Sequence, residues 1–253
     1  MLKKTFLIGL CGAMAIGSLF GVRAYSFDSP KEENFEVSEI SEINSGGESN
    51  MLIDVPEISQ LGVLPTGCES VSATMLLNFY GYDLSANEFV DKYLEKKEIS
   101  EHPDPNSAFV GSPYDANSYG CFAPCIAKAM NKVLKSGERA IAIKGEKLEN
   151  IVEKYVKKGI PVLAWTTMDM RETKHRKSWI IGYVDENAEY KKGDTFSWPG
   201  NEHCVVLVGY NEEDYLVNDP LKPKDEVVSF YEKELFKKRY REQGSQIVVI
   251  EKN

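Results

Sequence analysis

The chain has 253 residues, of which 42% are hydrophobic and 27% are charged, and its formal net charge is −9. This composition is typical of a globular protein and excludes a disordered or repeat-built chain. The acidic excess, with no long Lys/Arg run outside residues 171–177, argues against contact with a phosphate backbone, so no nucleic-acid partner is expected. Five cysteines are too few for a disulfide scaffold of this length.

The N-terminus has the pattern of an export signal. Lys3 and Lys4 precede an uncharged apolar run over residues 5–22. The run leads into Val22-Arg23-Ala24, a small-residue pattern that suits cleavage after Ala24. The run of about 18 residues is at the lower limit for crossing a bilayer. Residues 1–24 are therefore predicted to be a signal peptide. The alternative is an uncleaved N-terminal anchor, and only in that case is contact with a membrane expected. The protein is expected to be secreted or otherwise extracytoplasmic.

The next stretch, residues 25–50, is predicted to be an acidic disordered linker. It holds seven acidic residues against Lys31 alone, and it ends in a run of Asn, Ser, Gly and Glu. Low hydrophobicity combined with one sign of charge disfavours a packed core. Whether this linker is a pro-segment stays open. The remaining residues, 51–253, are long enough for one domain, and a monomer is expected.

Within residues 51–253 the predicted elements place helices first and an antiparallel sheet later, which is the layout of an α+β fold. Hydrophobic periodicity, capping residues and turn residues delimit these elements. In chain order they are a short strand at 51–55, helices at 69–79, 85–94, 123–134 and 147–158, a buried strand at 160–165, two strands at 204–209 and 215–217 around a turn, a last helix capped by Ser229 and Glu232, and a closing strand at 246–250.

Cys68 is the first candidate for chemistry. It follows the turn Pro65-Thr66-Gly67 and stands at the first residues of an apolar helix. The unpaired N–H groups and partial positive charge of a helix N-terminus stabilise a thiolate and lower the cysteine pKa. The same N–H groups can bind an oxyanion, and Gln60 in the preceding loop could add a side-chain donor. The alternative is that Cys68 is a buried apolar cysteine.

His203 and Asp219 are predicted to be neighbours across two strands. His203 opens the strand at 204–209, and a turn near 211–214 returns the chain so that the residue opposite His203 is numbered about 219 to 222. An aspartate there can hold the imidazole tautomer and orient it toward a thiol. Cysteine, histidine and aspartate in this order are typical of a cysteine-nucleophile site. Structural roles, a strand-end histidine and a turn aspartate, are the alternatives.

Three sequence segments resemble a known family. They are Pro65-Thr66-Gly67-Cys68-Glu69-Ser70 with Gln60 before it, Glu202-His203-Cys204-Val205-Val206-Leu207-Val208-Gly209-Tyr210, and Val217-Asn218-Asp219-Pro220. Together they are similar to the stand-alone relatives of the double-glycine leader peptidases, cysteine peptidase family thirty-nine. The resemblance implies a papain-like fold, Cys68 as nucleophile, His203 as base, Asp219 as orienting residue, Gln60 as oxyanion donor, and no cofactor or metal.

The resemblance limits the functional prediction as well as supporting it. The leader peptidases are fused to a membrane transporter, whereas this chain carries an export signal, so leader cleavage is not carried over. The prediction is an exported thiol hydrolase that cleaves peptide or isopeptide bonds of a peptide or protein, with the cell envelope as one possible source. The alternatives are a cell-wall amidase or acyltransferase, and a catalytically silent peptide-binding module of the same fold.

The other cysteines offer weaker signals. Cys121 and Cys125 lie four residues apart, and in an exported protein they could form a disulfide or stay unpaired. A zinc site there would need two further ligands that nearby residues do not supply. Cys204 points to the sheet face opposite His203 and is expected in the core. Trp198, close before His203, is equally compatible with a substrate groove and with the core.

Overall fold

The computed structural model describes residues 50–252. The signal peptide predicted for 1–24 and nearly all of the linker predicted for 25–50 lie outside the described residues. Within the described part, no helix is long and apolar enough to cross a bilayer.

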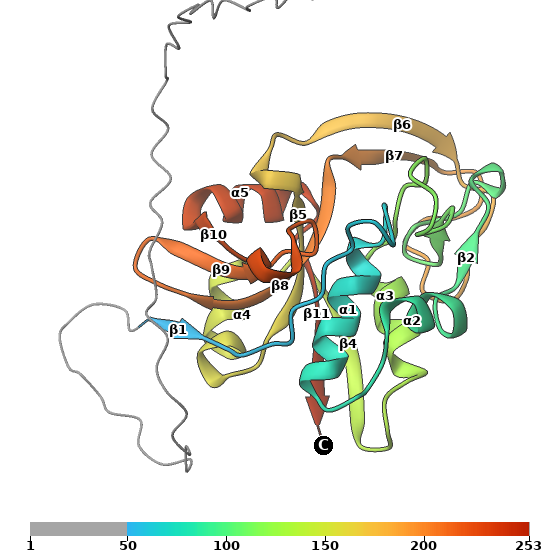
Figure 1. Cartoon of the computed structure of the whole chain (residues 1–253). Coiled ribbons are helices and arrows are strands. Elements are labelled where there is room, and N and C mark those ends of the chain that lie inside the picture. Colours follow the sequence, from blue (N-terminus) through green and yellow to red (C-terminus); the bar gives the residue numbers. More distant parts are fainter. Residues whose placement is uncertain (1–49, 253) are drawn as a thin grey trace, which may run out of the picture. The chain divides into compact units, whose positions relative to one another are not determined.

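A seven-stranded sheet forms the centre of the fold (Figure 1), and every strand pair in it is antiparallel. The strand order is β10-β9-β8-β5-β11-β4, and β1 pairs with the far end of β8. Residues of β5 and β8 are buried along their whole length, as expected for central strands. The strands are β1 (Met51–Leu52), β4 (Glu138–Lys144), β5 (Val162–Thr167), β8 (Glu202–Tyr210), β9 (Asp214–Asn218), β10 (Val228–Glu232) and β11 (Gln246–Lys252).

Five α-helices pack around this sheet. Figure 1 shows α1, α2 and α3 together on one side and α4 and α5 on the other. Helix α1 packs on β8 and β5, α3 on β4 and β11, and α5 on β5, β9 and β10. The helices are α1 (Cys68–Phe79), α2 (Ala86–Lys92), α3 (Ala123–Asn131), α4 (Leu148–Lys154) and α5 (Lys233–Glu242), with short 3₁₀ turns η1 (Ile99–Glu101), η2 (Val156–Lys158), η3 (Met168–Met170) and η4 (Lys224–Glu226).

The predicted α+β layout is confirmed, and the local signals account for most element ends. Ser85 caps α2 by accepting a hydrogen bond from the Glu88 N–H at 3.1 Å, as the Ser-x-x-Glu pattern indicates. After α4, the 3₁₀ turn η2 ends at Gly159, whose φ is +75°, a value that glycine adopts without strain.

The predicted start of the last helix was wrong. Ser229 lies in β10, paired with Val217 of β9. Helix α5 begins only at Lys233, and Glu232 alone caps it, with its side chain accepting the N–H groups of Glu234 and Leu235. The Ser-x-x-Glu spacing coincides here with a strand that adds to the sheet edge, and strand pairing overrides the local capping signal.

A two-stranded ribbon was not predicted. Strands β6 (Lys174–Ile180) and β7 (Thr195–Gly200) pair with each other outside the main sheet (Figure 1), and a second small pair joins β2 (Lys96–Lys97) to β3 (Phe109–Val110). The ribbon holds an aromatic cluster. Trp198 stacks on Phe122 with ring centroids 5.5 Å apart and packs edge-on against Tyr119 at 5.4 Å. The ribbon is therefore fixed beside the end of β8 where His203 lies.

Candidate active site

Cys68 is the first residue of α1 and faces a cavity. The turn before it is tight, because a Cβ on Gly67 would lie 2.6 Å from the Cβ of Leu64, closer than packed carbon atoms allow. A glycine therefore lets the chain enter the helix against Leu64. Cys68 as a whole is buried, with 7% of its surface exposed, and it lines this cavity.

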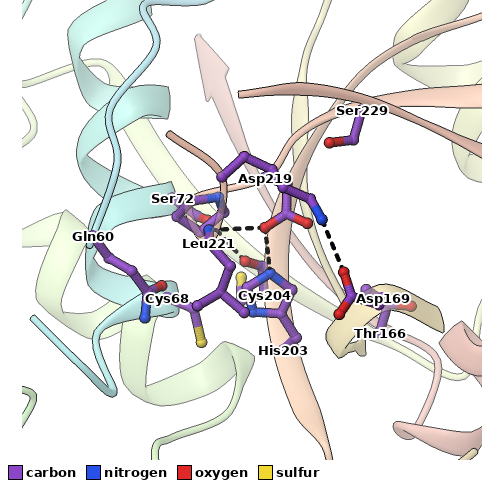
Figure 2. Close-up of polar contacts among 12 residues, drawn as sticks. Gln60, Cys68, Ser72, Thr166, Asp169, His203, Cys204, Asp219, Leu221 and Ser229 are labelled. Carbon is purple, nitrogen blue, oxygen red and sulfur yellow. Dashed lines mark hydrogen bonds and ion pairs between the residues drawn. The ribbon is translucent and has the colours of Figure 1, made fainter. Parts of the chain in front are cut away.

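His203 and Asp219 meet as predicted. The His203 Nε2 atom lies 2.7 Å from Asp219 Oδ1, and both side chains are buried (Figure 2). His203 sits in β8 opposite Thr166 of β5, and Asp219 follows the last residue of β9. The β8–β9 hairpin contains a register shift between Leu207 and Gly209, yet the turn still returns the aspartate to the histidine.

Three hydrogen bonds fix the Asp219 carboxylate. Besides His203, the Leu221 N–H donates to Oδ1 at 2.9 Å and the Tyr231 hydroxyl donates to Oδ2 at 2.9 Å. Burial by itself would raise the pKa of Asp219, but the hydrogen bond and charge of His203, with the Leu221 N–H and the Tyr231 hydroxyl, outweigh it and lower the pKa to about 2. The group is therefore ionised at any physiological pH and accepts from the imidazole.

One cavity of about 190 Å³ connects Cys68 with His203. In Figure 2 the Cys68 side chain and the His203 ring lie next to each other, with Gln60 on the far side of Cys68. Asp219 lies behind His203 and does not reach the cavity. Helix α1 and strand β8 are held together here, because the Ser72 hydroxyl donates to the Cys204 carbonyl at 3.0 Å. The cavity is lined by Gln60, Pro65, Thr66, Cys68, Ala116, Ser118, Tyr119, Met168, Trp198, Asn201, Glu202, His203 and Leu221.

Gln60 is positioned at the cavity by its backbone. Its N–H donates to the Pro220 carbonyl at 2.9 Å, which ties the loop before α1 to the loop that follows Asp219. Its side-chain Nε2 donates to the Pro65 carbonyl at 3.2 Å. An amide nitrogen carries two hydrogens, so the second remains for an oxygen in the cavity.

The thiol of Cys68 is hydrogen-bonded to Glu69 and not to His203. Its sulfur donates to Glu69 Oε2 at 3.2 Å, and among the hydrogen bonds of residues 50–252 none joins Cys68 to His203. Burial, then the charges of Glu69, Glu202 and Cys204, raise the pKa of Cys68 well above its usual range, and a hydrogen bond from the Cys204 backbone N–H only partly opposes this. Burial and the neighbouring carboxylates therefore oppose the thiolate that the helix N-terminus is expected to favour.

Two glutamates beside Cys68 were not predicted to belong to the site. Glu69 is fully buried and Glu202 is 8% exposed. With Cys68, they are the one group in residues 50–252 where three potential metal ligands lie within 4.8 Å of one another. Both Glu69 oxygens already accept hydrogen bonds, from the Cys68 thiol and from the Cys121 N–H. Glu69 therefore already has a hydrogen-bond donor on each of its carboxyl oxygens.

The other cysteines have structural positions. Cys121, Cys125 and Cys204 are buried free thiols, so the structure does not contain the disulfide that the spacing of Cys121 and Cys125 allowed. Cys204 packs in the core as expected. Trp198 combines the two roles that were considered, since it is 2% exposed and also lines the cavity.

Cys68 stands at a helix start, and His203 is paired with Asp219 across adjacent strands. Cys68 and His203 open on one cavity of this α+β fold. This arrangement resembles that of thiol hydrolases. The chain belongs to the Peptidase_C39 like family, whose model matches residues 52–248. Among curated proteins, it is 25% identical over 192 residues to the uncharacterized protein YvpB of Bacillus subtilis strain 168, covering 75% of this chain and 70% of that protein.

One solved structure agrees with this assignment. A candidate C39-like peptidase from Bacillus anthracis has a TM-score of 0.67 and 26% identity, over 81% of this chain and 99% of that chain. A double glycine motif protease from an AMS/PCAT transporter, solved with its leader peptide, is more distant, with a TM-score of 0.46 and 14% identity over 80% of this chain and 95% of that chain. The resemblance to a C39-like peptidase family is thus confirmed by the whole domain and not by the motifs alone.

Proposed function

We propose that this chain is an exported cysteine peptidase that hydrolyses peptide or isopeptide bonds through Cys68, His203 and Asp219. The observation that supports this most strongly is the shared cavity, in which Cys68 and a histidine held 2.7 Å from a buried aspartate face the same space. Family membership supports peptidase chemistry. Export is supported by the sequence pattern of residues 1–24.

The chemistry follows from these positions. His203 Nε2 faces Asp219, so Nδ1 is the ring atom that takes the Cys68 proton. The sulfur then attacks the carbonyl carbon of a substrate, and the developing oxyanion is stabilised by the N–H groups at the start of α1 and by the Gln60 amide. The amine leaves with the proton from His203, and water hydrolyses the thioester to regenerate the thiol.

The test is a cleavage assay on the full-length chain. A mixture of peptides derived from cell-envelope and cytosolic proteins is incubated with the protein, and products are identified by mass spectrometry. We expect cleavage that disappears in Cys68→Ala and in His203→Ala and persists in Cys125→Ala, which removes a buried thiol outside the cavity. Cleavage that survives Cys68→Ala would contradict the proposal.

One observation favours the silent-module alternative. The thiol hydrogen bonds to Glu69 at 3.2 Å and not to His203, which is the geometry of a resting thiol. The two functions separate in a labelling experiment with iodoacetamide and peptide mapping under reducing conditions. In a peptidase Cys68 reacts well before the buried Cys121, Cys125 and Cys204, and the advantage is lost in His203→Ala. In a silent module no cysteine is favoured.

A further inference from the structure

Two carboxyl groups are buried together beside the proposed nucleophile. Glu69 follows Cys68 in α1, and Glu202 precedes His203 in β8, so each is the sequence neighbour of a residue of the proposed catalytic pair. One oxygen of each glutamate and the Cys68 sulfur all lie within 4.8 Å of one another. Gly120 passes so close that a Cβ there would lie 2.3 Å from Glu69 Oε1 and 3.1 Å from Glu202 Oε2.

The two carboxyls differ in their hydrogen bonds. Glu69 Oε1 accepts the Cys121 N–H at 2.7 Å, and Oε2 accepts the Cys68 thiol at 3.2 Å. Glu202 Oε1 is buried without any hydrogen-bond partner. A carboxylate needs donors when it is buried, whereas a protonated carboxyl costs less to leave unpaired. The contacts therefore place the negative charge on Glu69 and a proton on Glu202.

Among the ion pairs of the residues that the structure describes, none involves Glu69 or Glu202, and the one positive charge that acts on Glu69 is that of His203. The titratable groups facing the pair are Cys68 from α1, His203 and Cys204 from β8, and Cys121 from the segment before α3. Two ionised carboxylates cannot share such a site, because burial and mutual repulsion both oppose the second charge.

We propose that Glu69 and Glu202 form an acid pair that holds at least one proton and sets the protonation state of the Cys68 thiol. This inference rests on the proposed thiol chemistry of Cys68. While Glu69 is ionised, its Oε2 accepts the S–H hydrogen and its charge opposes a thiolate, so Cys68 rests as a thiol. When the pair takes up a second proton from solvent, Glu69 Oε2 becomes a donor toward sulfur. The S–H proton can then pass to His203 Nδ1, leaving a thiolate bonded to the Glu69 O–H.

The two glutamates accordingly act as positioning residues, not as nucleophile or base. Burial, opposed by the Cys121 and Glu69 backbone N–H groups, the Cys68 thiol and the charge of His203, raises the pKa of Glu69 to about 7. Burial and the charge of Glu69 raise the pKa of Glu202 well above its usual range. Cys68 is therefore expected to change from resting to activated thiol near neutral pH, and the activated form is the one favoured below that pH.

The experiment measures Cys68 alkylation in the full-length chain across pH 5.5 to 8, by peptide mapping under reducing conditions. Glu69→Gln keeps an oxygen for the Cys121 N–H and mimics the protonated residue, so we expect alkylation about tenfold faster than wild type near pH 8, where about a tenth of Glu69 is protonated, and little change near pH 5.5. Glu202→Gln replaces a carboxyl that already holds a proton with a neutral group of the same shape, so we expect its alkylation profile to stay close to wild type. Glu212→Gln, an exposed glutamate in the β8–β9 turn, is the matched control.

A second measurement does not depend on thiol reactivity. Infrared spectroscopy at pH 8, where Glu69 is mostly ionised, should detect the carbonyl stretch of a protonated buried carboxyl. This band should be lost in Glu202→Gln and kept in Glu212→Gln. Faster alkylation in Glu69→Gln alone, together with this band, supports the acid pair, since loss of structure would change Glu202→Gln as well. An alkylation profile of Glu69→Gln that matches wild type, or absence of the band, overturns it.

The outcomes also separate this inference from the proposed function. If Cys68 shows the expected shift in Glu69→Gln but the chain cleaves no peptide, the peptidase proposal fails and the acid pair stands. If peptides are cleaved and the alkylation profile of Glu69→Gln matches wild type, the acid pair fails and the peptidase proposal stands.

Discussion

The Nε2 atom of His203 lies 2.7 Å from Oδ1 of Asp219, and the second carboxylate oxygen accepts the hydroxyl of Tyr231 at 2.9 Å. Both oxygens of Asp219 are therefore committed to fixed donors before any substrate enters the cavity. Asp219 is thus held both by Tyr231 of β10 and by His203 of β8. His203 in turn has one tautomer available, with the proton on Nε2 and the lone pair on Nδ1.

This anchoring makes the Asp219→Asn variant informative. An asparagine can donate to Nε2 and so favours the wrong tautomer of His203 without changing the volume of the side chain. We expect peptide cleavage to fall by a hundredfold or more while the circular dichroism spectrum is unchanged. Asp225→Asn, at an exposed position of η4, should cleave at the wild-type rate. A loss of activity that accompanies unfolding, or no loss at all, would contradict the orienting role.

Gln60 should affect the reaction after the thiol has been activated. Removing one oxyanion donor costs about a hundredfold to a thousandfold in kcat, so Gln60→Ala should lose about this much with little change in KM. The rate of Cys68 alkylation is the internal control, because alkylation forms no oxyanion. If Gln60→Ala slows alkylation and cleavage by the same factor, the residue shapes the turn at Pro65 and is not an oxyanion donor.

Tyr231 should contribute to acid stability. The folded pKa of Asp219, about 2, lies below the ordinary value of 3.8, so the stabilisation is complete above about pH 4 and is lost as the pH falls through about 2. Tyr231→Phe removes one hydrogen-bond donor to the Asp219 carboxylate. The pKa of Asp219 in the folded state then rises, and the stabilisation is lost at a higher pH. We expect a loss of about 2 kcal/mol near pH 7, measured by urea unfolding.

The matched control for Tyr231 is Tyr114→Phe. Tyr114 also donates to an aspartate, Asp91, at 3.0 Å, but this contact is exposed, and exposed charged contacts contribute little. Its free energy of unfolding should stay within about half a kcal/mol of wild type. Equal losses in the free energy of unfolding of Tyr231→Phe and Tyr114→Phe would show that burial of the Tyr231–Asp219 hydrogen bond does not add to its stabilising effect.

The sequence contains enough local information to predict the parts of the site that depend on neighbouring residues. Cys68 follows a Pro-Gly turn at the start of an apolar helix, and His203 and Asp219 are related by the arithmetic of one hairpin. Each of these relations spans fewer than about twenty residues, so strand and helix geometry determine them. The register shift in β8 was small enough to leave the aspartate within reach.

The carboxyl environment of Cys68 could not be predicted in the same way. A glutamate in the first turn of a helix usually faces solvent and interacts with the helix dipole. Glu69 is buried instead because the segment through Gly120 and Cys121, about fifty residues later, covers it and donates a hydrogen bond. Tyr231 reaches Asp219 only because Val228–Glu232 forms a strand where a helix cap was predicted. Both features depend on tertiary packing that no local pattern encodes.

The acid pair should also be visible in the stability of the protein. The folded pKa of Glu69, about 7, lies above its ordinary value of 4.5, so the folded state binds the extra proton. The sign is opposite to that of Asp219. This stabilisation is fully present below about pH 4.5 and is lost as the pH rises through about 7. The shift in the pKa of Glu69 from 4.5 to about 7 corresponds to about 3 kcal/mol. Urea unfolding at pH 5.5 and at pH 8 measures the part that is lost between these two pH values.

Glu202→Gln should keep this pH dependence, because Glu202 is already neutral and burial is what opposes the ionisation of Glu69. Glu212→Gln should retain the wild-type difference between the two pH values. A buried pair that shares a proton is most stable in acid, whereas two independently ionised carboxylates with good donors would make the protein more stable in base. A free energy of unfolding that rises from pH 5.5 to pH 8 in wild type, and by the same amount in Glu202→Gln, would therefore contradict the shared proton.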